Sequence, residues 1–291
     1  MTVHFLNGKN SIEMLLVKIK MMYMNDGVQG IIVDWAGTTI DFGCIAPAKA
    51  FVEVFRKHGI ELSLEEVRGP MGLAKRDHVK AILEYPGVAL RWESNYKRKV
   101  TEGDIDIIYQ DLEPAMAIVA ADFANPIKGT LEFMDEMHKL GIKVGSTTGY
   151  TEPIMRNLIP AAAKFGFMPD CIVNSSDVHS GRPKPWMCYL NAQRMNIYPM
   201  QTMIKIGDTI ADLEEGLNAG MWTICLTLSG NEIGLTREEV ESSSATEIKQ
   251  KVNAVKSRFL SAGAHYTAEG IWECLPIIEL INEKLKYGQR P

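Results

Sequence analysis

The sequence has few cysteines, and their spacing forms no recognisable pattern. Five cysteines are scattered over 291 residues without a C-x-x-C motif. An odd, unpatterned set argues against a disulfide framework and against a structural zinc site. It favours a reducing compartment, so we expect a cytoplasmic protein.

The chain also lacks long apolar runs and an excess of positive charge. No apolar run is long enough to span a bilayer, so no membrane association is expected. Lysine and arginine number 31 against 36 aspartates and glutamates, which gives a formal net charge of −5. This balance offers no basic face for nucleic acid. Neither class of partner is expected.

The N-terminal segment Met1–Asp26 has no features of a secretory signal. Its part Ser11–Met24 is amphipathic and methionine-rich, and lysines interrupt its apolar residues. The uninterrupted apolar core and the cleavage site of a secretory signal are missing. We interpret Met1–Asp26 as an extension, which is a short surface helix, a start placed too far upstream, or a targeting or interaction segment.

Apolar strands alternate with amphipathic helices over most of the remaining chain. Helical periodicity is found, for example, at Gly129–Leu140 and Trp186–Met195. Alternation of this kind is typical of an α/β fold with a doubly wound parallel sheet. The predicted strands are Val28–Asp34, Ile142–Ser146, Cys171–Val173, Met203–Ile206 and Trp222–Leu226.

The interval between the first and second predicted strands is too long for a simple crossover and should hold structure of its own. Apolar residues recur there at helical spacing. We assign residues 44–121 to a helical cap, and residues 27–43 and 122–291 to the catalytic core. Further helices are expected at Glu238–Phe259 and Ile271–Leu285. The predicted cap helices are Pro47–His58, Ser63–Arg68, Lys75–Glu84, Ala89–Val100 and Ile105–Ala121.

Four short motifs follow the predicted strands or lie between them. The first strand delivers Asp34 to a turn, and ligand sites in open α/β sheets favour the carboxyl ends of strands. A short motif alone is weak evidence, but four in order are strong. The motifs are DWAGTT at Asp34–Thr39, STTGY at Ser146–Tyr150, GRPKP at Gly181–Pro185, and GDTIAD at Gly207–Asp212.

The order of these motifs resembles the haloacid dehalogenase superfamily of phosphoryl-transfer enzymes. One departure from the usual superfamily pattern indicates a particular family within the superfamily. The usual phosphatase of that superfamily has a general acid two residues after its nucleophile, and this chain has Ala36 there. The segments MGLAKRDH at Met71–His78 and GSTTGYTEPIM at Gly145–Met155 are similar to the phosphonatase family, the phosphonoacetaldehyde hydrolases.

The resemblance implies hydrolysis of the carbon–phosphorus bond of phosphonoacetaldehyde to acetaldehyde and phosphate. Cleavage would expel a carbanion, so an electron sink is needed, and a lysine imine can provide one. The resemblance assigns that role to Lys75 and the attack on phosphorus to Asp34. His78 lies about one turn after Lys75 on the same helical face and could relay protons, or it is structural.

A magnesium ion is also implied, because it prefers hard oxygen ligands. Its ligands would be Asp34, the carbonyl of Ala36, Asp208 and Asp212, the last either directly or through water. A separate explanation for Asp208 and Asp212 is a helix N-cap and a first-turn acid.

The phosphoryl group and the rest of the substrate would contact further residues. The resemblance gives phosphate binding to Thr148, the amide of Gly149 and Arg182, whose planar guanidinium suits phosphate oxygens. Lys184 could share that task or lie on the surface. The residues that match the family's substrate pocket, each of which could equally be packing, are Cys44, Met71 and Tyr150.

The resemblance to this family also implies a homodimer joined through the caps. The helical insert adds an apolar surplus that could seek a partner, at Ile105, Ile107, Ile108, Met116 and Ile118. Two alternatives to the phosphonatase function stay open. One is a related phosphatase or phosphomutase acting on a small phosphate ester, and the other is an inactive phosphate-binding relative.

Overall fold

The structure, a computed structural model, describes residues 27–291. The predictions for Met1–Asp26 lie outside this range. None of the helices in residues 27–291 is long and apolar enough to cross a membrane.

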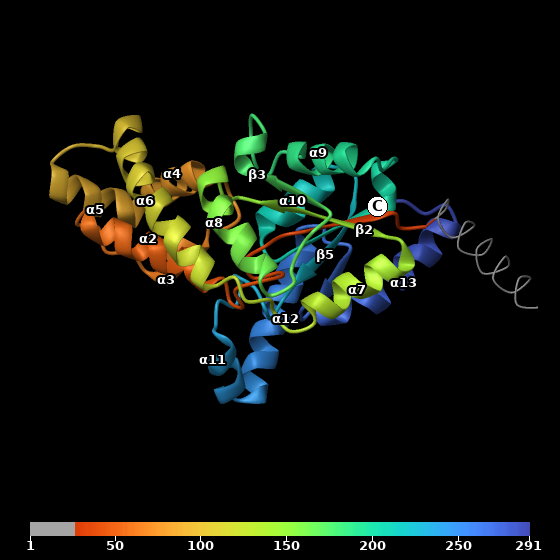
Figure 1. Ribbon diagram of the computed structural model, residues 1–291. Coiled ribbons are helices and arrows are strands. Elements are labelled where there is room, and N and C mark those ends of the chain that lie inside the picture. Colours follow the sequence, from red (N-terminus) through yellow and green to blue (C-terminus); the bar gives the residue numbers. More distant parts are fainter. Residues whose placement is uncertain (1–26) are drawn as a thin grey trace, which may run out of the picture.

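A parallel sheet lies at the centre of the fold with helices around it (Figure 1). Its six strands follow the order β3-β2-β1-β4-β5-β6. The five predicted strands are confirmed with small shifts at their ends. The sixth strand was not predicted, because it has only three residues and two of them are half-buried. The strands are β1 (Gly30–Val33), β2 (Lys143–Thr148), β3 (Cys171–Asn174), β4 (Met203–Gly207), β5 (Trp222–Leu226) and β6 (Tyr266–Ala268).

Strand β1 lies between β2 and β4, so the carboxyl ends of these three strands are neighbours. Val33, its last residue, is in register with Ser146 of β2 and Ile206 of β4. The chain segments that follow these strands carry three of the four predicted motifs. The sheet topology therefore brings together residues that are far apart in the sequence.

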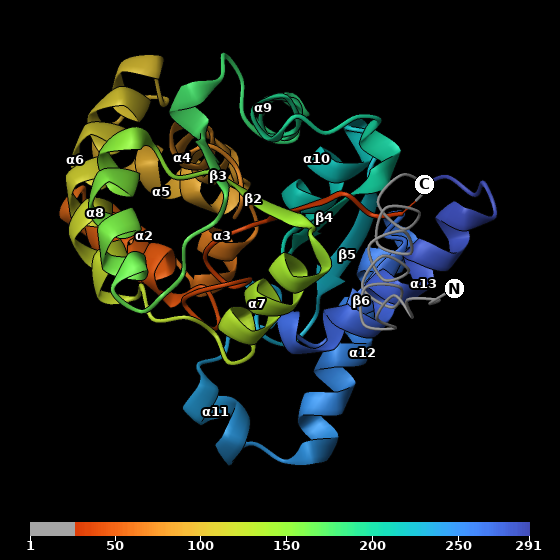
Figure 2. The same cartoon turned by 45° about the vertical axis from the view of Figure 1, so that its right-hand side comes forward.

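Helices cover both faces of the sheet (Figure 2). On β1, Ile31 and Val33 belong to the large apolar core that includes α7 (Thr130–Leu140) and α13 (Cys274–Lys286). Ile32 points to the opposite face and packs in a second cluster with α9 (Trp186–Met195). Successive strand residues face opposite sides, which explains this division. On the side of α9 also lies α10 (Ile210–Asn218).

The insert between β1 and β2 is helical, as predicted, and it groups at one end of the molecule (Figure 1). We call it the cap. Its last helix packs against α8 (Glu152–Ala163), which follows β2. The cap helices are α2 (Ile45–Lys57), α3 (Leu64–Arg68), α4 (Lys75–Glu84), α5 (Pro86–Tyr96) and α6 (Glu102–Asp122).

Several predicted helices differ from the structure at their ends or in their continuity. Helix α5 begins at Pro86, earlier than predicted, because proline suits the first turn. Helix α6 begins at Glu102, because Thr101 forms a capping box before it. The single helix predicted over Glu238–Phe259 is two helices, α11 (Arg237–Ser242) and α12 (Ala245–Ser261).

The expected apolar surplus on the cap is mostly absent. Ile105, Ile108 and Met116 are buried inside the cap, so the prediction that they are surplus surface was wrong. Helix α6 packs against α2, α4 and α8, which leaves little of its apolar surface uncovered. Ile107 and Ile118 do face outward, with 53% and 69% of their surface exposed.

Candidate active site

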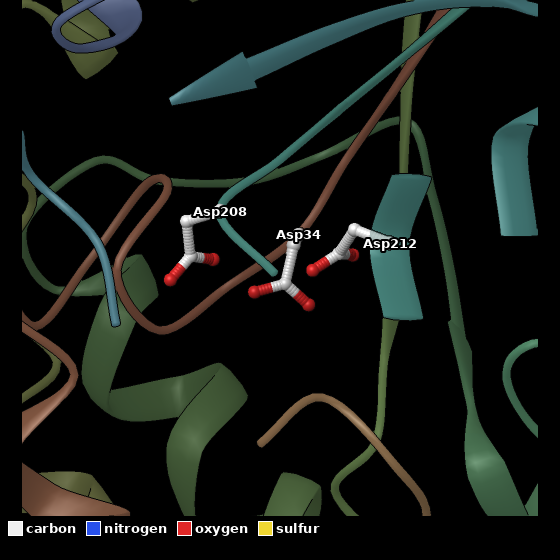
Figure 3. A group of neighbouring side chains, drawn as sticks. All are labelled: Asp34, Asp208 and Asp212. Carbon is white, nitrogen blue, oxygen red and sulfur yellow. The ribbon is translucent and has the colours of Figure 1, made fainter. Parts of the chain in front are cut away.

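Three buried aspartates meet at the carboxyl ends of the central strands (Figure 3). Asp34 follows β1, Asp208 follows β4, and Asp212 lies in the first turn of α10. One carboxylate oxygen from each lies within 4.8 Å of the others. This is the cluster that the motifs predicted.

Neutral donors hold two of these carboxylates, those of Asp208 and Asp212. Thr38 Oγ1 donates to Asp208 Oδ1 at 3.0 Å, and the Asn231 N–H donates to Asp208 Oδ2 at 2.8 Å. Thr209 Oγ1 donates to Asp212 Oδ2 at 2.6 Å and is also the N-cap of α10. The N-cap residue of α10 is therefore Thr209 and not Asp208, so helix capping does not explain Asp208.

The aspartate cluster fits a divalent cation. Burial raises the pKa of Asp34 to about 6, and the charge of Asp212 adds to that effect against the opposing charge of Arg182. Burial, with Asp34 and Asp212, raises the pKa of Asp208 well above its usual range. Like charges held this close without solvent disfavour ionisation, and a cation would reverse that. All donors are hard oxygens, which suits magnesium.

Close packing of the nucleophile turn also shapes this site. Gly37 has φ +87°, and a Cβ there would lie 2.2 Å from an Asp208 carboxylate oxygen. Only glycine can bring the turn this near to the acidic cluster. The turn that follows Asp34 therefore places its backbone close to the Asp208 carboxylate.

Arg182 enters the site as a buried cation. Its Nη2 lies 2.7 Å from Asp34 Oδ1 and 3.0 Å from Asp212 Oδ1. Its Nε donates to Glu215 Oε2 at 3.0 Å. Glu215 thus holds Nε of the guanidinium, while Nη2 contacts Asp34 and Asp212.

Lys205 and Glu215 are site residues that the sequence analysis missed. Lys205 Nζ lies 2.9 Å from Asp212 Oδ1 and 3.3 Å from Glu215 Oε2, and it donates to Thr147 Oγ1 at 2.8 Å. A lysine inside the otherwise apolar strand MIKIG was the available signal. Burial would raise the pKa of Asp212, but Arg182 and Lys205 outweigh it and lower that pKa. Lys184 is exposed.

A small cavity of about 20 Å³ lies where the cap meets the core. A volume of this size holds about one water molecule. A substrate of several heavy atoms therefore requires the cap and core to separate. The cavity brings together nearly all predicted catalytic and binding residues; its lining is Asp34, Ala36, Cys44, Pro47, Met71, Gly72, Lys75, Thr148, Gly149, Tyr150, Arg182 and Thr209.

Lys75 is the cap's basic group in this cavity. It is the first residue of α4 and only 4% exposed. Its Nζ lies 5.0 Å from the centre of the Tyr150 ring and 5.8 Å from that of Phe51. Burial lowers the pKa of Lys75 to about 8, although Cys44 and Asp34 act in the opposite direction. A substantial neutral fraction is thus available near neutral pH, as amine attack on a carbonyl requires.

His78 does not line the cavity. Its Nε2 lies 2.7 Å from the Val67 carbonyl oxygen, so that nitrogen carries the proton and donates. Its ring packs 3.9 Å from the Phe51 ring. Burial, and then the charge of Lys75, lower the pKa of His78 well below its usual range. A neutral, packed histidine fits the structural role, and proton relay stays a prediction.

Comparison with known proteins defines the class of this fold and site. A model of the haloacid dehalogenase-like hydrolase family matches residues 28–220. Fold, motif order and acidic cluster thus describe a haloacid dehalogenase-like hydrolase.

More similar relatives narrow the class. The chain is 48% identical to a phosphonoacetaldehyde hydrolase of Syntrophobacter fumaroxidans, over 91% of this chain and 95% of that one. It is 45% identical to a phosphonoacetaldehyde hydrolase of Bacillus cereus, over 88% and 97%. A crystal structure of a phosphonoacetaldehyde hydrolase-like protein from Oleispira antarctica superposes with a TM-score of 0.89 at 37% identity, covering 91% of this chain and 96% of that one. The chain belongs to the phosphonoacetaldehyde hydrolase family.

Proposed function

We propose that this protein hydrolyses the carbon–phosphorus bond of phosphonoacetaldehyde to acetaldehyde and phosphate. One observation carries the proposal. Lys75, a buried lysine whose pKa is lowered to about 8, lines the same cavity as the buried Asp34. Ala36 occupies the place of a general acid in the same cavity. Cleavage of a phosphate ester needs that acid but has no use for a neutral lysine.

The first step is imine formation at Lys75. The neutral amine adds to the aldehyde carbon, the carbinolamine hydroxyl takes up a proton from solvent and leaves as water, and a protonated imine remains. Its nitrogen can accept the electron pair of the carbon–phosphorus bond. Burial favours this step, because it increases the neutral amine fraction.

The second step is attack of an Asp34 carboxylate oxygen on phosphorus. The carbon–phosphorus bond breaks, and its electrons move to the imine nitrogen to give an enamine. Protonation of the enamine carbon and hydrolysis then release acetaldehyde and free Lys75. Water hydrolyses the aspartyl-phosphate to phosphate. Arg182, together with Thr148 and the Gly149 amide, would hold the phosphoryl oxygens.

Magnesium would be held by Asp34, the Ala36 carbonyl, Asp208 and Asp212, the last directly or through water. When bound, it would neutralise charge on the phosphoryl oxygens and keep Asp34 ionised. The buried, mutually repelling carboxylates support this assignment.

We also propose that residues 44–121 form the cap domain, as expected from the sequence. We further propose a homodimer joined through this cap. Fewer exposed apolar residues support the dimer than the sequence led us to expect. Ile107 and Ile118 are exposed and lie eleven residues apart on α6, which is three turns and the same face.

Phosphate release is the test of the proposed reaction. The purified protein is given phosphonoacetaldehyde, with and without magnesium, and in parallel a simple phosphate ester. We expect release from the phosphonate that depends on magnesium, and little from the ester. Release from the ester alone would replace the proposal with a phosphatase, and release from neither would favour an inactive relative.

A further inference from the structure

A second contact between cap and core lies beside the catalytic cavity and involves Arg68, the last residue of α3. Arg68 Nη1 donates to the Gly43 carbonyl at 2.8 Å, and Nη2 donates to the Gly234 carbonyl at 3.0 Å. Nη1 also donates to Asn231 Oδ1 at 3.3 Å, and Asn231 Nδ2 returns a bond to the Arg68 carbonyl at 3.0 Å. We call the reciprocal pair Arg68 and Asn231 the clasp.

On the core side, the clasp joins a loop that also touches the acidic cluster. Asn231 uses its side chain for Arg68 and its backbone N–H for Asp208 Oδ2. In the same loop, Ser229 Oγ donates to the Gly37 carbonyl at 2.9 Å. One short loop therefore contacts the nucleophile turn, a candidate metal ligand and the cap.

On the cap side, the clasp lies at the start of the loop that ends at Lys75. The Arg68 carbonyl also accepts from the Met71 N–H at 3.1 Å. Gly72 has φ +91°, and a Cβ there would lie 2.4 Å from Thr209 Oγ1. The loop is thus seated directly on the core. Arg68 holds one end of this loop, and the other end carries Lys75.

We propose that Arg68 and Asn231 are positioning residues that hold the cap closed with Lys75 above Asp34. The inference rests on the proposed function in one respect only, namely that the closed arrangement of cap and core is the catalytic one. Since Lys75 and Asp34 are buried and the cavity that they line has room for about one water, the clasp breaks for substrate to enter and reforms before reaction. A groove of about 740 Å³, lined by both partners, lies alongside and gives water access to the opened groups.

Substitutions of the clasp provide a kinetic test. Arg68→Met should lower kcat/KM about tenfold or more, the effect of losing charge-assisted hydrogen bonds. Arg68→Lys should recover part of it. Asn231→Ala keeps the backbone N–H to Asp208 and should resemble Arg68→Met. Because the pair acts as a unit, the double variant should be little worse than either single variant. Multiplying effects would contradict the clasp.

Cap opening has a readout that does not depend on activity. Cys44 lines the cavity between cap and core and is buried, so its alkylation by iodoacetamide, followed by mass spectrometry, reports opening. We expect faster alkylation of Cys44 in Arg68→Met and Asn231→Ala. Arg91→Met is the matched control, because the Arg91 ion pair with Glu66 at 2.6 Å lies within the cap. It should alkylate at the wild-type rate.

The outcomes separate the two proposals. Unchanged alkylation and unchanged kcat/KM in the clasp variants would overturn the clasp, as would a lower melting temperature without faster alkylation. If Arg68→Met does not fold, Arg68→Lys and Asn231→Ala carry the same measurements. If the wild-type protein fails to hydrolyse phosphonoacetaldehyde, the proposed function is lost, while the alkylation rates still decide whether the clasp holds the cap.

Discussion

The protonation of Lys75 gives the sharpest quantitative expectation. The pKa of Lys75 falls from 10.5 to about 8, mainly through burial. One unit corresponds to about 1.4 kcal/mol, so burial favours the neutral amine by roughly 3 kcal/mol. With that pKa, the neutral fraction is about 3% at pH 6.5, about 24% at pH 7.5 and about 76% at pH 8.5. An ordinary lysine would be neutral in well under about 0.1% of molecules at pH 7.

The perturbation is pH, and the assay is reductive trapping of the imine. Acetaldehyde with cyanoborohydride isolates the amine step, because no phosphoryl group is present to titrate. The initial rate of labelling at Lys75, located by mass spectrometry, should rise about tenfold per pH unit below pH 8 and then level off. The loss occurs on the acid side because the protonated amine cannot attack. Lys75→Arg gives the background, and Asp34→Asn removes the neighbouring titration near pH 6.

Two results would refute this reasoning. A midpoint near 10.5 would mean that Lys75 is solvated when the imine forms. Faster labelling of another lysine would mean that the cavity does not select the nucleophile.

Four further expectations concern other parts of the molecule. Asp34→Asn should lose hydrolysis while trapping at the lysine continues, and substantial phosphate release by this variant would favour direct attack by water. Lys205→Met should reduce the free energy of unfolding in urea by about 3 kcal/mol, because it leaves buried carboxylates short of a partner; a change within error would show that Arg182 suffices. Sedimentation should give about twice the 32.4 kDa chain mass, and a monomer in Ile107→Glu; a wild-type monomer at micromolar concentration refutes the dimer. Deletion of residues 1–26 should leave turnover unchanged, and a severe loss in a folded protein would place that segment at the site.

Local patterns were sufficient for the strands and for the acidic cluster. Asp34 and Asp208 each follow an apolar strand, and parallel strands bring their carboxyl ends together. The fold class could therefore be predicted, and with it the meeting of these side chains. The short strand β6 escaped prediction because its three residues carry too little pattern and its pairing with β5 is long-range.

Contacts set by packing between elements could not be predicted. Lys205 on β4 meets Glu215 only because α10 packs against that strand. His78 lies on the expected face of α4, but its partner is the carbonyl of Val67, which belongs to the preceding cap helix. Likewise, three of five cap residues expected at the surface are buried, because periodicity does not tell which neighbour a helix face meets.

The central claim is that Lys75 forms the covalent intermediate with the phosphonate in the cavity that it shares with Asp34. Borohydride added during turnover of phosphonoacetaldehyde tests it most directly, with peptide mapping of the labelled protein. The account predicts irreversible inactivation, one label at Lys75, and neither label nor turnover in a folded Lys75→Arg protein. Full activity of Lys75→Arg, or a label at a different lysine, would contradict it.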